Sequence, residues 1–63
     1  MIFQTAKEFA AAAAELGQMD LAMRPDETDP WRNQRNLIRY HLYAAQTKAR
    51  EIAEALAAKE RHG

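Results

Sequence analysis

Apolar residues recur at alternating steps of four and three along the first third of the chain. The positions are Ile2, Ala6, Phe9, Ala13, Leu16 and Met23, and Asp20 interrupts them. Such steps place side chains on one face of an amphipathic helix. Thr5 and Glu8 fit a capping box at its start. Arg24 precedes Pro25, which biases it away from helical angles, so we expect a helix over about residues 6–23.

The second half of the chain carries a longer and more regular pattern. Asp29 at the N-cap and Pro30 at the first helical position form a start signal. The same alternating steps connect Trp31, Arg35, Ile38, Leu42, Ala45, Ala49, Ile52, Leu56 and Lys59. Six consecutive members, from Ile38 to Leu56, are apolar, which is typical of a coiled-coil seam. We expect a helix over about residues 30–61, joined to the first by a polar turn at 24–29.

The two patterns predict an all-α fold, a two-helix antiparallel hairpin that forms a single domain over residues 1–63. At 1.5 Å per residue the helices would be about 27 and 46 Å long. A tight turn would therefore leave the C-terminal part of the seam uncovered, at Ile52, Ala53, Leu56 and Ala57. We expect a second copy to cover this overhang and the open side of the hairpin, which gives a four-helix bundle. The dimer interface would be formed by Ile38, Leu42, Ala45, Ala49, Ile52 and Leu56.

Size and composition also favour a homodimer. Chains of 63 residues bury little surface and usually need disulfides, a metal or oligomerisation. The chain has no cysteine, and neither His41 nor His62 has a partner at metal-ligand spacing. We expect no metal and no cofactor, so oligomerisation is the remaining means of stabilisation.

Charge is balanced overall but unevenly placed. Residues 1–30 hold two basic and six acidic side chains, whereas residues 31–63 hold seven basic and three acidic ones. Halves of opposite sign can attract each other within a hairpin or between chains. No apolar run reaches the roughly 18 residues of a membrane span, and the N-terminus lacks the basic leader of a signal peptide. We expect a cytoplasmic protein without membrane contact.

Arginine and tyrosine gather on one face of the second predicted helix. Arg32, Arg39, Tyr43 and Arg50 fall within about 40° of one another on a helical wheel, on the side away from the seam. These residue types are enriched at binding hot spots, although an ordinary solvated face has the same pattern. Arg32 and Arg35 lie where the helix dipole disfavours cations, so a countercharge should come from the acidic turn or from a partner. The predicted partner-binding residues are Trp31, Arg32, Arg35, Arg39, Tyr40 and Tyr43.

Nothing in the sequence indicates catalysis. The chain contains neither serine nor cysteine, and its only glycines, Gly17 and Gly63, cannot form a phosphate-binding loop. A catalytic site would need a nucleophile, a base and an orienting group in a pocket. We therefore expect no enzyme but a small interaction protein, a regulator, adaptor or inhibitor that binds another protein through its helix faces.

Two alternatives remain open. In size and two-helix design the chain resembles the Rop family of plasmid copy-number proteins, which implies a dimeric bundle that binds paired RNA loops. That resemblance is architectural and carries no binding residue over. Five basic residues from Arg32 to Arg50 support it, whereas the neutral overall charge weighs against it. The second alternative is a structural subunit of a larger assembly.

Overall fold

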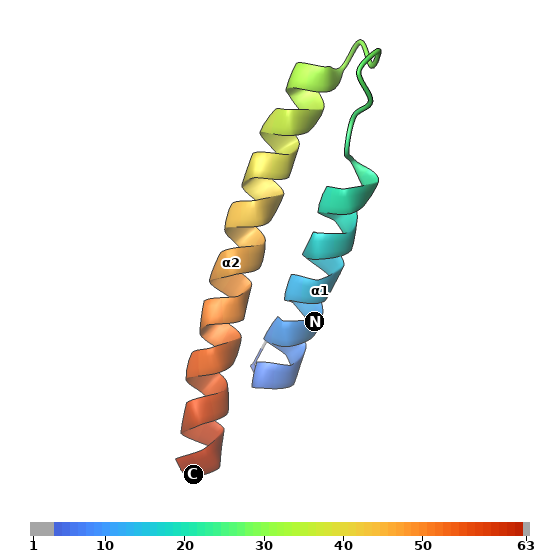
Figure 1. Ribbon diagram of the computed structural model, residues 1–63. Coiled ribbons are helices and arrows are strands. Elements are labelled where there is room, and N and C mark those ends of the chain that lie inside the picture. Colours follow the sequence, from blue (N-terminus) through green and yellow to red (C-terminus); the bar gives the residue numbers. More distant parts are fainter. Residues whose placement is uncertain (1–3, 63) are drawn as a thin grey trace.

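The computed structural model describes residues 4–62, and within them two helices pack side by side in opposite directions (Figure 1). Helix α1 spans Ala6–Ala22 and helix α2 spans Arg32–His62. The molecule is a rod of 52 × 17 × 15 Å. The predicted all-α hairpin is confirmed. Ile2, the first member of the predicted stripe in helix α1, lies outside the described residues.

Helix α1 begins with the predicted capping box. The Glu8 N–H donates to Thr5 Oγ1 at 3.2 Å, and the N–H groups of Gln4 and Thr5 each donate to Glu8 Oε1 at 3.0 Å. These bonds lower the pKa of the Glu8 carboxyl, the Gln4 N–H contributing most and the Thr5 N–H next, against a small desolvation effect. A further cap comes from the far end of α2, because the Ala6 N–H donates to Glu60 Oε2 at 3.0 Å. A carboxylate here also interacts favourably with the helix dipole.

Helix α2 begins at Arg32, two residues after the predicted start. Asp29 nevertheless caps it, since Asp29 Oδ1 accepts a hydrogen bond from the Trp31 N–H at 2.8 Å. The Arg32 N–H donates to the Asp29 carbonyl oxygen at 3.2 Å. Residues 29–31 therefore form a turn that leads into the helix, and Pro30 belongs to this turn.

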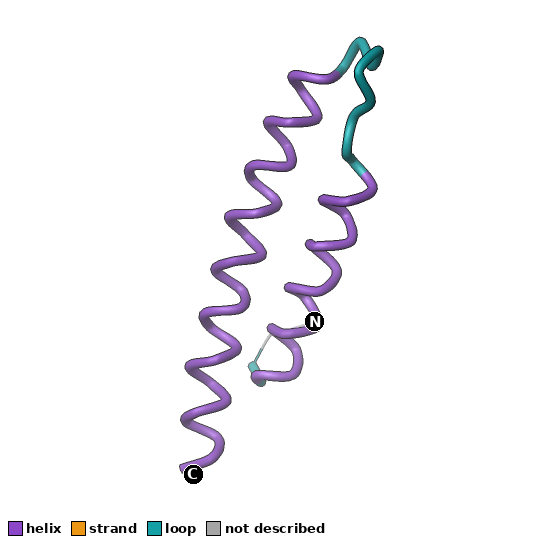
Figure 2. Tube along the Cα trace, in the orientation of Figure 1, coloured by secondary structure: helices purple, strands orange, loops and turns teal. Residues whose placement is uncertain are grey.

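The connection between the helices is an extended segment. The first part of the segment 23–31 runs beside the first turns of α2, and the chain then reverses through the turns that lead into α2 (Figure 2). Helix α1 is therefore displaced toward the C-terminal part of α2, as the bond from Ala6 to Glu60 shows. The prediction that Ile52, Ala53, Leu56 and Ala57 lack a neighbour is wrong. Ala53 is buried and the other three are half-buried, because the extended connection moves α1 down along them.

The two helices approach each other through alanine. Among the described residues only Ala13 and Ala53 are buried, with 4% and 8% of their surface exposed. Small side chains permit this close approach. As a result, α2 faces α1 with a row of residues that differs from the predicted seam. The half-buried or buried positions include Arg39, Gln46 and Ala53. The predicted seam placed Ile38, Ala45 and Lys59 there instead, and these three are exposed, so the predicted register of the seam is wrong at those positions.

Gly17 lies on the inner side of α1 beside Gln46. A Cβ atom added at Gly17 would be 2.8 Å from Gln46 Nε2. The three nearest atoms all belong to the flexible end of the Gln46 side chain, so the close neighbour of this glycine is a side chain.

Candidate functional site on the faces of the hairpin

Two of the predicted partner-binding arginines are held in ion pairs within the hairpin. Arg39 Nε donates to Asp20 Oδ1 at 2.7 Å, and the two side chains are 29% and 22% exposed. Asp20 is the residue that interrupts the apolar stripe of α1, and it faces α2. The Arg39 guanidinium is therefore directed toward α1.

Arg35 is paired with the acidic turn. Its Nε lies 2.6 Å from Asp29 Oδ2, an ion-pair distance, but the N–H does not point at the oxygen and no hydrogen bond forms. The turn thus supplies a countercharge for Arg35, one of the two sources expected for it.

The remaining predicted partner-binding residues are exposed but do not form one stripe. Arg32 and Tyr43 share a face of α2, and Tyr43 is 63% exposed. Tyr40 lies beside this face, with its ring edge-on to His41 at a centroid distance of 5.6 Å. Trp31 precedes α2 and is 61% exposed.

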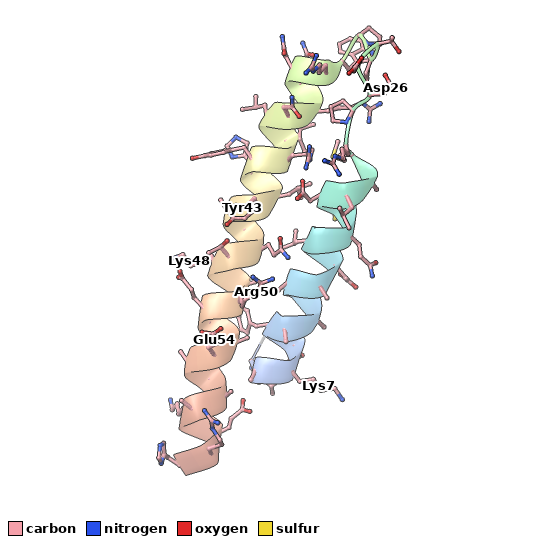
Figure 3. All side chains as sticks on the ribbon, in the orientation of Figure 1. Lys7, Asp26, Tyr43, Lys48, Arg50 and Glu54 are labelled. Atoms are coloured by element: carbon pink, nitrogen blue, oxygen red, sulfur yellow. The ribbon has the colours of Figure 1, made fainter. Side chains whose placement is uncertain are left out.

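Two of the four residues that share one face of α2 on the helical wheel (Arg32, Arg39, Tyr43 and Arg50) lie beside α1. Arg39 contacts Asp20 of α1, and Arg50 lines a groove between the helices (Figure 3). The predicted position of these residues was the side of α2 away from the seam, and Arg39 and Arg50 show that this side borders α1. The reason is that α2 faces α1 with the side that carries Ala53, whereas the predicted seam would have faced α1 with the side that carries Ile38 and Ala45.

That groove, which we call the alanine groove, opens between α1 and the C-terminal half of α2. It has a volume of about 520 Å³. Its apolar floor is formed by Ala6, Ala10, Ala13, Ala14, Ala53 and Ala57. Lys7, Arg50 and Glu54 supply its charged groups. Alanines spaced four apart on both helices are the sequence signal for this groove, which the predicted seam did not include.

On the opposite flank of the hairpin, the described residues include a face made of apolar side chains, and we call it the charge-free face. Helical spacing places on it Phe9, Ala12, Leu16, Met19 and Met23 from α1, and Ile38, Leu42, Ala45, Ala49, Ile52 and Leu56 from α2. All six residues predicted for the dimer interface lie there. Met19 and Ile38 are 51% and 43% exposed, so large apolar side chains meet solvent on this face.

The described part of the chain offers neither a metal site nor a membrane span. Within residues 4–62, no group of three or more His, Cys, Asp or Glu side chains could hold a metal ion. Neither of the two helices there combines the length and the apolar composition needed to cross a membrane.

Comparisons of the chain with family models, with curated proteins and with solved structures found no match.

Proposed function

We propose that this chain is a small non-enzymatic interaction protein, a regulator, adaptor or inhibitor that binds another protein through its helix faces. We propose further that its folded unit is a homodimer in which two hairpins form a four-helix bundle. The observation that carries both proposals is the amount of apolar surface that the single hairpin leaves in solvent.

The surface area of the hairpin supports the homodimer. The chain exposes 5240 Å². A compact monomer of 7.2 kDa would expose about 4,100 Å² by the usual scaling of surface with mass. The excess is about 1,100 Å², comparable to the roughly 800 Å² that each partner buries in a stable protein interface.

The composition of the buried interior supports the same proposal. No large side chain among the described residues is fully buried, and the two buried residues are alanines. A fully buried large apolar side chain contributes about 1.5–3 kcal/mol, so an alanine core supplies little of the stability that 63 residues require. A second layer of helices would bury the half-exposed side chains.

The surface offered to a different protein is the exposed part of α2 around Tyr43. Arg32 and Arg50 have no ion pair among the described residues, and Tyr43, Tyr40 and Leu37 are exposed nearby. Arginine and tyrosine on a rigid helix are common anchors of protein interfaces. Arg35 and Arg39 are excluded from this surface because they are paired internally.

Capture of partners on the immobilised protein, followed by mass spectrometry, tests this surface. We expect the double variant Arg32→Glu with Tyr43→Ala to lose a protein that the native chain captures. Gln18→Ala, a change at an exposed residue of α1 away from Tyr43, should retain that protein. An identical set of captured proteins for all three chains would contradict the assignment of this surface.

Nucleic-acid binding as in the Rop family is less well supported by the geometry. Arg35, Arg39 and Lys48 are engaged in ion pairs with Asp29, Asp20 and Glu51. A phosphate-binding face normally carries several cations free to meet the backbone. A structural subunit of a larger assembly is distinguished from the proposed homodimer by the mass of the purified protein.

A further inference from the structure

The charge-free face is bordered by charges of opposite sign on its two outer edges. On α1, Glu15 lies one turn from both Ala12 and Met19, and Glu8 lies one turn from Ala12. On α2, Lys48 lies one turn from Ala45 and Ile52, and His41 and Lys59 continue the same edge. Lys48 is also paired with Glu51 at 3.2 Å, but Glu51 lies farther round α2 from the face. The charged side chains next to the face are therefore acidic on α1 and basic on α2.

A two-fold interface joins the same surface of each copy. Two alternative two-fold arrangements of a dimer would bury the charge-free face. If the axis is parallel to the helices, both turns lie at one end and each α1 rests on α2 of the second copy. If the axis runs across the helices, the turns lie at opposite ends and like helices rest on one another. The two dimers differ in which edges become neighbours.

We call the position of a residue along the long axis of the rod its level. The levels determine which charges would meet across the interface. Gly17 is level with Gln46, and Ala6 is level with Glu60. Counting two residues along both helices from these pairs puts Glu15 level with Lys48, and puts Glu8 within one residue of the level of Lys59. A parallel axis preserves level, so it brings Glu15 beside Lys48 of the second copy. A transverse axis instead places acidic edge against acidic edge and basic edge against basic edge, which is repulsive.

Side-chain volumes along the face favour the same arrangement. At preserved level, Leu16 of α1 faces the small Ala45 and Ala49 of the second copy, and Ala12 faces its Ile52. Large residues opposite small ones interdigitate and fill the space between layers.

We propose that a second copy of the chain docks on the charge-free face with its two-fold axis parallel to the helices. Both turns then lie at the same end of the bundle, and α1 of each copy packs on α2 of the other. This inference rests on the homodimer proposed above and adds its interface and its orientation. It also leaves Tyr43 and the alanine groove open on the outside of the bundle.

A distance between the two turns tests the orientation directly. Glu27 is exposed in the turn, and the chain has no cysteine, so Glu27→Cys carries a single nitroxide label per chain. The proposed dimer predicts a label separation near the roughly 10 Å spacing of packed helices, lengthened by the label arms. A separation approaching the 52 Å length of the rod would overturn the orientation.

The mass of the same labelled sample, measured by light scattering, distinguishes failure of the orientation from failure of the homodimer. A dimer with a long label separation defeats the orientation and leaves the homodimer standing. A monomer defeats the homodimer itself, including the case in which the charge-free face is covered by an unrelated helix.

Charge reversal supplies a second test, in which the sign of the effect decides. Glu15→Lys should raise the dimer dissociation constant roughly two- to tenfold, as expected for exposed ion pairs, and adding Lys48→Glu should restore it. Lowering of the dissociation constant by Glu15→Lys alone would contradict this orientation, because the native Glu15 would then face other acidic side chains of the second copy, as on the acidic edges of the transverse dimer. Glu54→Lys at the alanine groove is the matched control and should have no effect.

The assignment of the face is tested by introducing a charge within it. Met19→Glu should convert the dimer to a monomer, whereas Ala14→Glu, at the alanine groove of the same helix, should not. Loss of the dimer in the Ala14 variant with retention in the Met19 variant would place the interface on the other flank.

Discussion

Asp20 introduces a carboxylate into the apolar stripe of α1, and Arg39 of α2 pairs with it at 2.7 Å. Both side chains are less than one third exposed, so removal of one leaves the other partly desolvated without its partner. We predict that Asp20→Ala lowers the free energy of unfolding by about 1–2 kcal/mol. Urea denaturation at fixed protein concentration measures this loss.

The exposed ion pair of Lys48 with Glu51 is the matched control for that prediction. Its side chains are 72% and 59% exposed, and Glu51→Ala should cost no more than about 0.5 kcal/mol. Replacing Asp20 and Arg39 together by leucine should be neutral or stabilising, since apolar substitutes avoid the desolvation of two charges. Equal costs for Asp20→Ala and Glu51→Ala would show that the inter-helix pair is no stronger than a solvated one.

Glu8 gives the hairpin a dependence on pH. Its pKa in the folded chain is lowered, chiefly by the Gln4 N–H and then by the Thr5 N–H. A lowered folded pKa means that the ionised carboxylate stabilises the fold above the unfolded pKa, and that this stabilisation is lost as pH falls through the folded value. The advantage of the native chain over Glu8→Gln should therefore shrink on acidification below about pH 4.3, the ordinary glutamate value.

Unfolding free energies of both chains across that range provide the measurement. Glu54→Gln is the control, because the Glu54 side chain makes no hydrogen bond among the described residues. A difference between the native chain and Glu8→Gln that does not change with pH would contradict the role of the ionised carboxylate in the capping box.

At the scale of the elements, local signals predicted the helices well. The Thr5 to Glu8 capping box and Asp29 located both helix starts to within two residues, because caps depend on neighbours in the sequence. The path of residues 23–31 depends instead on where α1 finds its closest packing on α2. This packing determines where α1 lies along α2. The helix lengths alone therefore could not predict which part of α2 extends beyond α1.

The register of α2 was missed for a related reason. Its apolar pattern marks all the surface that α2 can bury, including surface left for a second chain under the proposed dimer. The alanine at position 53 is buried against α1, while Ile38 remains 43% exposed. Periodicity alone cannot divide one apolar stripe between an intramolecular and an intermolecular neighbour. The pairing of Arg35 with the turn could be predicted, because the turn is acidic and adjacent in sequence.

Gly17 lies inside α1, where its low helix propensity lowers the stability of the helix. Glycine inside a helix costs about 1 kcal/mol relative to alanine. The atom nearest to a Cβ at position 17 is the flexible Gln46 Nε2, which can move away. We predict that Gly17→Ala raises the free energy of unfolding by up to about 1 kcal/mol, measured by thermal denaturation with circular dichroism. A loss of stability would instead indicate that Gly17 is required for close packing.

At the scale of the whole molecule, the single hairpin has only a small apolar core. Its two buried residues are alanines, and seven large apolar side chains are exposed among residues 4–62. Folding should therefore be coupled to association, and stability should depend on protein concentration. We predict that the thermal midpoint rises as the concentration increases from micromolar to millimolar, whereas an independently stable hairpin would show a constant midpoint.

The central claim is that two hairpins complete one core. Light scattering on a size-exclusion column at micromolar concentration measures it most directly. We predict a single species with twice the 7.2 kDa mass of the chain. A compact, fully helical monomer of 7.2 kDa under the same conditions would contradict the claim.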